Sequence, residues 1–324
     1  MKRTNDNFLH RKVIILGSGP AGCTSAIYTS RAGLRPILIT GFQKGGQIAL
    51  ANSVENWTGL YPSQTGSFIM ENTLRQVRNF IPFSDIIEDQ IYKVDLTNRP
   101  FLLFGSLKRY SCDSLIIATG SSFRNLGLSF EKRFEGKGVS FCATCDGFFY
   151  RNQKIAVVGG GNNALEEAIY LSKIAKEVNL IHRSKKFRAE KLLIDKIYKK
   201  VNQKKVFLYT NYVVCDAEGN EKGITSIKIK SNLNGSEKNL FVSGIFVAVG
   251  SNPNTSIFQG QLDLQDGYIK TSLKSRCMTE TSVKGVFAAG DVSDSFYRQA
   301  ISSAGTGCMA AIDAERYLYK VGDI

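Results

Sequence analysis

The sequence lacks a long hydrophobic run, and this absence argues against a membrane-spanning helix. No apolar stretch approaches the roughly 18 residues that such a helix needs. The polar, basic residues 1–12 are followed by the short apolar stretch Val13–Leu16, which is too short for the core of a signal peptide. We therefore expect a cytoplasmic protein with no membrane partner.

Histidine is scarce, and the cysteines lack the spacing of a metal site. The chain has only two histidines, His10 and His182, and only one Cys-x-x-Cys, so no set of zinc ligands is complete and we expect no metal. Seven cysteines form an odd, scattered set, unlike the disulfide framework of a small secreted protein. Only Cys142 and Cys145 lie close together, and we expect the other five to be small buried side chains.

The charge is strongly one-sided, with 42 lysines and arginines against 28 acidic residues and a formal net charge of +14. No zinc-finger spacing, RNA-binding aromatic motif or basic helix with a zipper accompanies this charge. We interpret the excess as a solvated, self-repelling surface that would also attract an acidic protein partner. Nucleic acid is not an expected partner.

Two strand–glycine–helix units stand out in the chain, whose 324 residues predict two domains. In the first, a strand at 12–16 leads into Gly17–Gly22, a helix to about residue 32 and a second strand at 36–40. In the second, a strand at 154–158 leads into Gly159–Ala164, a helix and a strand at 178–182. This order is typical of dinucleotide-binding folds, so the chain is expected to bind two dinucleotides.

The two units belong to separate domains, one of them discontinuous. The buried strand at 114–120 and its partner strand at 244–250 are predicted to mark where the chain leaves the first domain and returns to it. The first domain then comprises residues 1–120 and 250–324, and residues 121–249 form an inserted domain. A strand at 285–291 and a helix at about 299–319 complete the first domain.

The residues that follow each glycine motif differ from the usual pattern. Such motifs commonly have an acidic residue after the second strand, which hydrogen-bonds a ribose hydroxyl. Thr40 and Gly41 stand there in the first unit, and His182 and Arg183 in the second. Arg183 and Arg188 could grip a 2′-phosphate, which favours NADPH over NADH. The alternative is a solvated basic loop.

Cys142-Ala-Thr-Cys145 is a candidate redox dithiol, because two intervening residues allow a disulfide. A pair of buried structural thiols is the alternative. Thiol–disulfide exchange needs help with protons, and no histidine lies near in sequence. Asp146 is therefore the candidate proton donor or relay, unless it only forms a turn before Gly147.

Taken together, these motifs resemble the low-molecular-weight thioredoxin reductases of bacteria, which are class-II pyridine nucleotide-disulfide oxidoreductases. The likeness extends over essentially the whole chain. The residues that carry it are Gly17–Gly22, Gly45–Gln47, Val54–Trp57, Cys142–Gly147, Gly159–Ala164, His182–Arg183, Gly250, Pro253–Thr255, Gly285–Asp291, Tyr297–Ala300 and Ser303–Cys308.

The resemblance implies an α/β fold with two Rossmann-like domains, FAD in the discontinuous domain and NADPH in the inserted one. The residues implied to bind FAD are Gly17, Gly19, Pro20, Ala21, Gly22, Thr40, Gly41, Gln43, Gly45, Gly46, Gln47, Asn56, Gly290, Asp291, Arg298, Gln299 and Ala300. Those implied to bind NADPH are Gly159, Gly161, Asn162, Ala164, His182, Arg183 and Arg188.

The resemblance also implies an activity. Electrons would pass from NADPH through FAD to a Cys142–Cys145 disulfide and then to oxidised thioredoxin, with domain rotation between steps. Cys145 would face the flavin, Cys142 would attack the substrate, and Asp146 would handle protons. Phe148 and Phe149 would help to dock thioredoxin, unless they are core aromatics. A homodimer is the habit of the family.

Some positions depart from the family pattern, and rival functions remain. Ser184 replaces a usual second arginine, which Lys185 or Lys186 would offset; Gln43, Thr58 and Lys137 replace a usual Glu, Pro and Arg. Only about a dozen residues precede the first predicted strand, so we do not expect the thioredoxin-fold extension of peroxiredoxin reductases, and the Cys-x4-Cys of glutathione reductases is missing. A disulfide reductase or dithiol oxidase with another dithiol substrate is the alternative.

Overall fold

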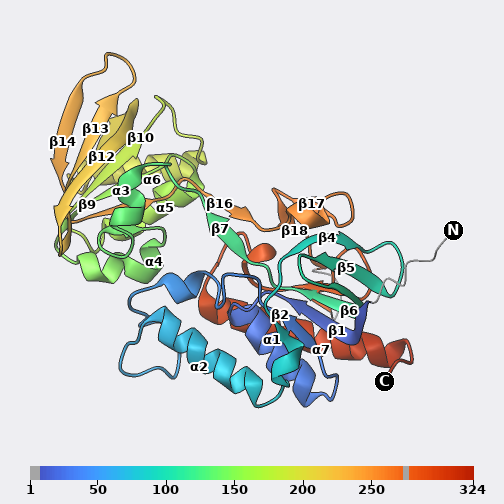
Figure 1. The fold of residues 1–324 in the computed structure, drawn as a ribbon. Helices are drawn as coiled ribbons and strands as arrows, with labels where there is room; N and C mark the ends of the chain where they lie inside the picture. The colour runs from blue at the N-terminus through green and yellow to red at the C-terminus, as the bar shows by residue number, and fades with distance from the viewer. Residues whose placement is uncertain (1–7, 273–276) are drawn as a thin grey trace. The chain divides into compact units, whose positions relative to one another are not determined.

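The computed structural model describes residues 8–272 and 277–324. It divides the chain into two compact units, Met1–Ser122 with Asn252–Ile324 and Phe123–Ser251 (Figure 1). Each unit is an α/β layer structure around a sheet that is parallel in the second unit and mostly parallel in the first, which confirms the predicted fold class.

The first unit has a seven-stranded sheet in the order β3-β2-β1-β6-β5-β4, with β19 also paired to β6. Its parallel strands are β1 (Leu9–Leu16), β2 (Ile37–Ile39), β3 (Ile86–Ile87), β6 (Arg109–Ile117) and β19 (Val286–Ala288). The antiparallel strands are β4 (Ile91–Asp95) and β5 (Phe101–Gly105). β1 begins earlier than predicted because residues 9–11 pair with β6.

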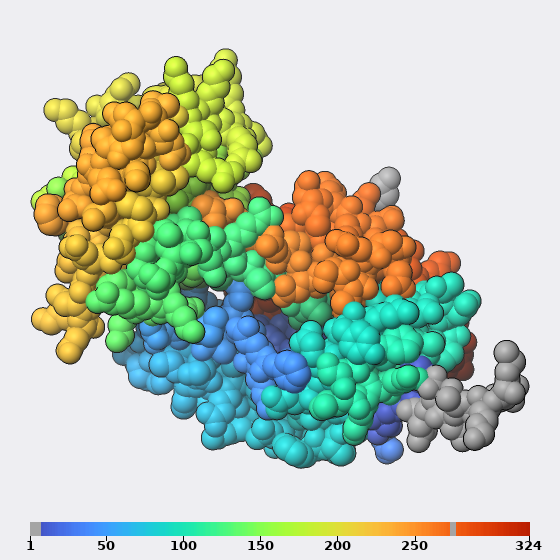
Figure 2. All heavy atoms as spheres, turned by 45° about the horizontal axis from the view of Figure 1, so that its top comes forward, coloured from blue at the N-terminus to red at the C-terminus, as the bar shows by residue number. Residues whose placement is uncertain are grey.

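Both faces of this sheet are covered. The helices α1 (Pro20–Arg31), α2 (Gly66–Arg78) and α7 (Ala300–Lys320) bury one face in an apolar core. On the other face, Phe258, Leu262 and Ile269 pack against β4, β5 and β6. They belong to the segment with β17 (Leu264–Gln265) and β18 (Tyr268–Ile269), drawn orange beside the teal β4–β5 hairpin in Figure 2.

The second unit has a five-stranded parallel sheet in the order β11-β10-β9-β15-β8. Its strands are β8 (Val139–Ser140), β9 (Lys154–Val158), β10 (Glu177–His182), β11 (Val206–Thr210) and β15 (Gly244–Val247). The helices α5 (Asn162–Leu171) and α6 (Lys191–Asn202) bury one face. The antiparallel sheet of β12 (Tyr212–Asn220), β13 (Gly223–Ser231) and β14 (Glu237–Phe241) buries the other.

Short elements complete both units. They are α3 (Ser129–Arg133), α4 (Ala143–Asp146), β7 (Ser121–Phe123), β16 (Ser251–Pro253) and the single 3₁₀ turns Gln47–Leu50, Phe83–Asp85, Gly147–Tyr150, Ser256–Phe258 and Gly290–Val292. Among the helices of the described residues, none combines the length and apolar content that crossing a bilayer requires.

The prediction that the strand at 114–120 partners the strand at 244–250 is wrong. The first is β6, which is buried between β1, β5 and β19; the second is β15, which is buried between β9 and β8. Each strand therefore completes the sheet of its own unit. The chain crosses between the units through the short segments that follow, β7 and β16, and these two pair with each other.

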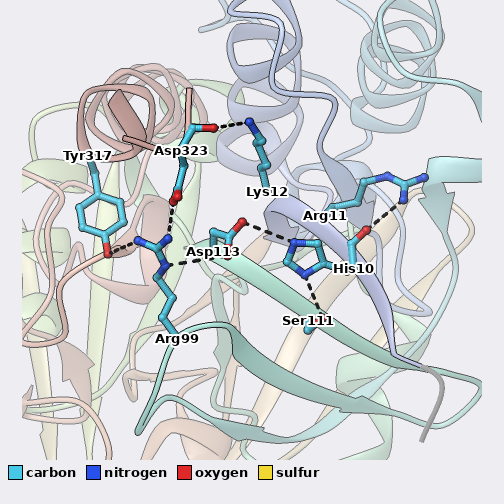
Figure 3. A network of polar contacts seen from close by, with 8 residues as sticks. All are labelled: His10, Arg11, Lys12, Arg99, Ser111, Asp113, Tyr317 and Asp323. Carbon is cyan, nitrogen blue, oxygen red and sulfur yellow. Dashed lines mark hydrogen bonds and ion pairs between the residues drawn. The ribbon is translucent and has the colours of Figure 1, made fainter. Parts of the chain in front are cut away.

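Within the first unit, a polar network ties the C-terminal residues to β1, β6 and α7 (Figure 3). Arg99 donates to the hydroxyl of Tyr317 at 3.3 Å, pairs with Asp113 at 3.8 Å and forms an ion pair with Asp323. Lys12 on β1 donates to the backbone carbonyl of Asp323. The guanidinium of Arg99 also lies over the Tyr317 ring, so one side chain joins β6, α7 and the C-terminal residues.

We expect Arg99→Ala to lower the free energy of unfolding by about 1 kcal/mol, since several partly screened contacts are lost together. The loss should shrink as salt is raised from 0.05 to 1 M in urea unfolding, because screening weakens the ion pairs of the parent, which the variant already lacks. Arg75→Ala is the control: its exposed pair with Glu71 at 2.6 Å on α2 stands alone, so a smaller change is expected. An equal effect of the two substitutions would contradict the role of the network.

Candidate functional site

The first glycine turn joins β1 to α1 and leaves the start of that helix uncapped by any side chain. Gly17 has a φ of +108°, and a Cβ there would lie 2.1 Å from the carbonyl oxygen of Ala118. A Cβ on Gly22 would lie 1.8 Å from the carbonyl oxygen of Gly17. Gly19 is the N-cap of α1 and offers no side chain to its first-turn N–H groups, whereas the hydroxyl of Thr65 caps α2. Such an open helix N-terminus fits a phosphate.

Ser18 connects this turn to the loop after β2. Its hydroxyl donates to the carbonyl of Thr40 at 3.1 Å and accepts from the N–H of Gly45 at 3.2 Å. A Cβ on Gly46 would lie 3.3 Å from the Cα of Gly19, so the two backbones nearly touch. The predicted segments Gly17–Gly22 and Thr40–Gln47 are thus brought together. The hydroxyl of Thr40 is buried and donates to the carbonyl of Gly41 at 2.9 Å.

Three further contacts involve the C-terminal candidates. The amide of Gln47 donates to the hydroxyl of Ser121 at 3.1 Å, and that hydroxyl lies 3.4 Å from Asp291. The amide of Asn56 lies 3.4 Å from the side-chain oxygen of Gln299. Ser303 links the two pairs, because its N–H donates to the carbonyl of Gln299 at 2.9 Å and its hydroxyl donates to Asp291 at 3.2 Å. The residues Gln47, Asn56, Asp291 and Gln299, predicted from separate motifs, therefore form one polar cluster in the first unit.

Asp291 is a partly buried carboxyl whose environment favours the protonated form. Burial raises its pKa above the usual range, and the hydroxyl of Ser303 at 3.2 Å opposes this by donating to the carboxylate. Ser121 and Ser303 are contacts that the sequence analysis did not assign. A serine that begins a short strand or lies within a helix carries no local pattern that would have revealed this role.

The second glycine turn, between β9 and α5, repeats the geometry of the first. Gly159 has a φ of +155°, and a Cβ there would lie 2.3 Å from the carbonyl oxygen of Ala248 and 2.6 Å from the Cβ of Ala164. Gly161 is the N-cap of α5, and no side chain caps that helix. A second open helix N-terminus therefore lies in the second unit.

The basic loop after β10 is fastened beside this turn. The N–H of Arg188 donates to the carbonyl of Gly160 at 2.8 Å, and the side chains of Asn162 and Glu190 are joined by a hydrogen bond of 3.1 Å. The N–H of Glu190 also donates to the amide oxygen of Asn162 at 2.8 Å. Glu190 was not predicted, because its pairing with Asn162 depends on the fold. The side chains of Arg183 and Arg188 are exposed.

The buried ring of His182 packs against this loop. It is 4% exposed, stacks on Phe187 with centroids 5.3 Å apart and contacts the carbonyl of Lys186 at 3.1 Å. Burial lowers the pKa of His182, and the charges of Arg188 and Arg183 lower it further. The neutral ring fills the space next to Gly160, where a Cβ would lie 2.2 Å from ring atoms.

The two candidate redox cysteines form a disulfide at the start of α4. Cys142 is the N-cap, and its sulfur accepts from the N–H of Cys145 at 3.2 Å. Gly147 follows where the chain packs against α5: a Cβ there would lie 2.8 Å from the Cδ2 of Leu171. The glycine after the acid thus lets this segment approach α5 closely.

Asp146, the candidate proton donor, is held by one hydroxyl. Ser140 donates to its carboxylate at 2.6 Å. Burial raises the pKa of Asp146 above the usual range, and the hydrogen bond from Ser140 lowers it in part. Burial, with the charge of Asp146, also raises the pKa of Tyr150 to about 12. A carboxyl in this setting can hold a proton at a pH where an exposed one cannot.

The aromatic residues next to the dithiol are on the surface. Phe148 is 58% exposed and Phe149 is 42% exposed. The guanidinium of Arg151 lies 5.3 Å from the ring centroid of Phe148. They are therefore not core aromatics. Among the described residues, no cluster of three or more His, Cys, Asp or Glu side chains could hold a metal ion.

Comparison with known proteins gives consistent matches over most of the chain. The family model of the pyridine nucleotide-disulphide oxidoreductases matches residues 11–311. The chain is 54% identical to a thioredoxin reductase of Escherichia coli O157:H7 over 97% of this chain and 98% of that protein. It is 52% identical to a glucosaminate ammonia-lyase of Pseudomonas fluorescens over 95% of this chain and 96% of that protein.

The fold has solved counterparts as well. The structure of a thioredoxin reductase from Giardia duodenalis matches with a TM-score of 0.89 and 36% sequence identity. The match covers 96% of this chain and 99% of that one.

Adjacent glycines of the second turn provide a matched test of the packing. We expect Gly160→Ala to lower the free energy of unfolding of the second unit by about 1–3 kcal/mol, because the new methyl group collides with the His182 ring. Gly161→Ala has no neighbour within 4 Å and should change it by less than about 0.5 kcal/mol. Urea midpoints followed by circular dichroism would measure both, and equal midpoints would refute the packing argument.

Proposed function

Because the chain belongs to the pyridine nucleotide-disulphide oxidoreductase family, and within it to the thioredoxin reductases, we propose that it reduces the disulfide of oxidised thioredoxin with electrons from NADPH. FAD and NADPH are the proposed cofactors. A cytoplasmic homodimer, as in the family it resembles, is part of the proposal.

The observation that carries the proposal is the Cys142–Cys145 disulfide next to a partly buried acid, on the unit with the second glycine turn. Once reduced, the sulfur of Cys142 attacks the substrate disulfide, and a mixed disulfide forms while the other substrate sulfur leaves as a thiolate and takes a proton. The sulfur of Cys145 then attacks Cys142, which restores the disulfide and releases the second substrate thiol. The carboxyl of Asp146 is suited to hold and return protons during this exchange.

The first unit provides a fitting environment for FAD. The uncapped start of α1 fits a pyrophosphate, and Gly17 and Gly22 allow the turn and the helix to approach each other closely. The cluster of Gln47, Asn56, Asp291 and Gln299 offers donors and acceptors for the rest of the molecule. Bound flavin would supply a two-electron carrier between nicotinamide and disulfide.

The second unit supports NADPH rather than NADH. Arg183 and Arg188 are exposed on a loop fastened to the glycine turn, and no acidic side chain follows β10 directly. Guanidinium groups bind a 2′-phosphate through charged, bidentate hydrogen bonds. Ser184 lies between them in the sequence, and its neighbours Lys185 and Lys186 would add positive charge.

One relative carries the name of an ammonia-lyase, and this is the second candidate function. Elimination of ammonia transfers no electrons to a disulfide, so it gives no use to the Cys142–Cys145 pair. The exposed Phe148 and Phe149 beside the dithiol favour a protein substrate. A small-molecule lyase would not need this surface.

The dithiol can be tested directly in purified, flavin-loaded protein. We expect Cys142→Ser and Cys145→Ser each to lower the rate of NADPH oxidation with oxidised thioredoxin by at least about 10³-fold, since neither variant can form the internal disulfide. Cys215→Ser, a cysteine away from the dithiol, is the control and should keep the parent rate. Thioredoxin-independent release of ammonia from glucosaminate that survives in both variants would favour the lyase instead.

The nucleotide preference depends on the basic loop. We expect Arg183→Ala to raise the KM for NADPH by about 10- to 100-fold, because a charged hydrogen bond to the 2′-phosphate is lost, and to leave the KM for NADH nearly unchanged. Arg133→Ala, an exposed arginine elsewhere in this unit, should change neither value. A parallel rise for both nucleotides would argue against recognition of the 2′-phosphate.

A further inference from the structure

A buried serine lies between the dithiol and its acid. Ser140 is 4% exposed and ends β8, two residues before Cys142. Its hydroxyl donates to Oδ2 of Asp146 at 2.6 Å and accepts from the N–H of Cys142 at 3.2 Å. A continuous chain of hydrogen bonds therefore runs from the backbone of the first cysteine, through one hydroxyl, to the carboxyl of Asp146.

The single proton of this hydroxyl has two possible acceptors. The carbonyl of Cys142 lies 3.4 Å from Oγ, and the carboxylate lies 2.6 Å away. A charged acceptor at the shorter distance forms much the stronger bond, so the proton of Ser140 points to Asp146. The N–H of Cys142 fills the acceptor side of the same oxygen and holds that orientation.

The backbone of Ser140 is fixed on both sides. Its residue position pairs with Phe246 of β15, and the next residue, Phe141, stacks on Phe123 with ring centroids 5.0 Å apart. The hydroxyl is therefore presented by a strand of the sheet rather than by a mobile loop. A donor held in this way orients its acceptor instead of following it.

The other groups near Asp146 give its carboxylate little support. Tyr150 follows on the same segment, and Tyr170 of α5 lies against Gly147. α5 also carries Glu167 one turn before Leu171, and the thiols of Cys142 and Cys145 titrate once the disulfide is reduced. None of these groups is a cation, so a hydroxyl donor is well suited to stabilise the charged carboxylate.

We propose that Ser140 is the positioning residue of the redox site: its hydroxyl orients the carboxyl of Asp146 relative to Cys142 and sets how tightly that carboxyl holds its proton. Burial raises the pKa of Asp146, and the hydrogen bond from Ser140 opposes that rise. The proposal rests on the proposed function only in giving Asp146 the role of proton donor. Ser140 itself touches no reacting atom.

The direct test is a carboxyl ¹³C NMR titration of Asp146 in the full chain labelled at aspartate, with Asp146→Asn to assign the signal. Ser140→Ala should raise the midpoint by about one to two pH units, because a donor that stabilises the carboxylate is removed. Ser140→Thr keeps the hydroxyl and should return the midpoint to within about half a unit. Ser172→Ala removes another buried serine of this unit, whose hydroxyl donates to Ile169, and should leave the midpoint unchanged.

An unchanged midpoint in folded Ser140→Ala overturns the proposal, and so does an equal shift in the Ala and Thr variants, which would mean a packing effect. Should Ser140→Ala fail to fold, Ser140→Gly also removes the hydroxyl and must show the same upward shift. The titration needs neither thioredoxin nor NADPH. A shifted midpoint in a protein that does not reduce thioredoxin would therefore refute the proposed function and leave the role of Ser140 standing.

The kinetic counterpart is the pH profile of thioredoxin reduction. The apparent pKa that Asp146 contributes to this profile should rise in Ser140→Ala by the same amount as the NMR midpoint. In Ser140→Thr it should return to the value of the parent. A normal profile in Ser140→Ala, with thioredoxin reduced as fast as by the parent, would overturn the role of Ser140 and leave the proposed function intact.

Discussion

The close approach of backbone to backbone at the two glycine turns is the constraint on which the rest of the structure depends. In each unit a carbonyl that follows a central strand, Ala118 or Ala248, occupies the space where a side chain on the first glycine would lie. The helix that follows can begin directly at the edge of the sheet only because that side chain is missing. Both helix N-termini are thereby left open to a ligand, and the loops that carry Thr40 and Arg183 are drawn in beside them.

Each unit contains an aspartate whose pKa is affected in the same two opposing ways. Asp146 and Asp291 are carboxyls whose pKa is raised by burial, and each accepts a hydrogen bond from a serine hydroxyl that opposes the effect. A hydroxyl lowers the cost of the charge without supplying a counter-charge, so the group can still change its protonation state. An arginine at the same distance would hold the carboxylate permanently ionised.

The sequence predicted most of what depends on local pattern. The strands before both glycine turns, the helices after them and the α/β class follow from hydrophobic periodicity and glycine spacing, which are local properties. The pairing of β6 with β15 was predicted wrongly, because two equally apolar strands carry no information about which sheet each one completes. The layer of β12 to β14 was not predicted either.

Among the site residues, the dithiol, Asp146 and the glycines could be named from motifs, whereas their supporting partners could not. Three such partners are held by hydrogen bonds that exist only once the chain has folded: Ser140 to Asp146, Ser121 to Gln47 and Glu190 to Asn162. A single serine or glutamate belongs to no sequence motif whose spacing would identify it as part of a site. The exposure of Phe148 and Phe149 likewise depends on which other segments pack against them, and the sequence alone does not predict this.

The pairing of β7 with β16 has a consequence for how such a chain can be assembled. The chain enters and leaves the second unit through two adjacent strands, so the whole insert has the connectivity of one large hairpin loop. Removing it would leave two ends of the first unit already next to each other, and a short turn could join them. A gene could therefore gain, lose or exchange this module at a single locus without rebuilding the sheet that hosts it.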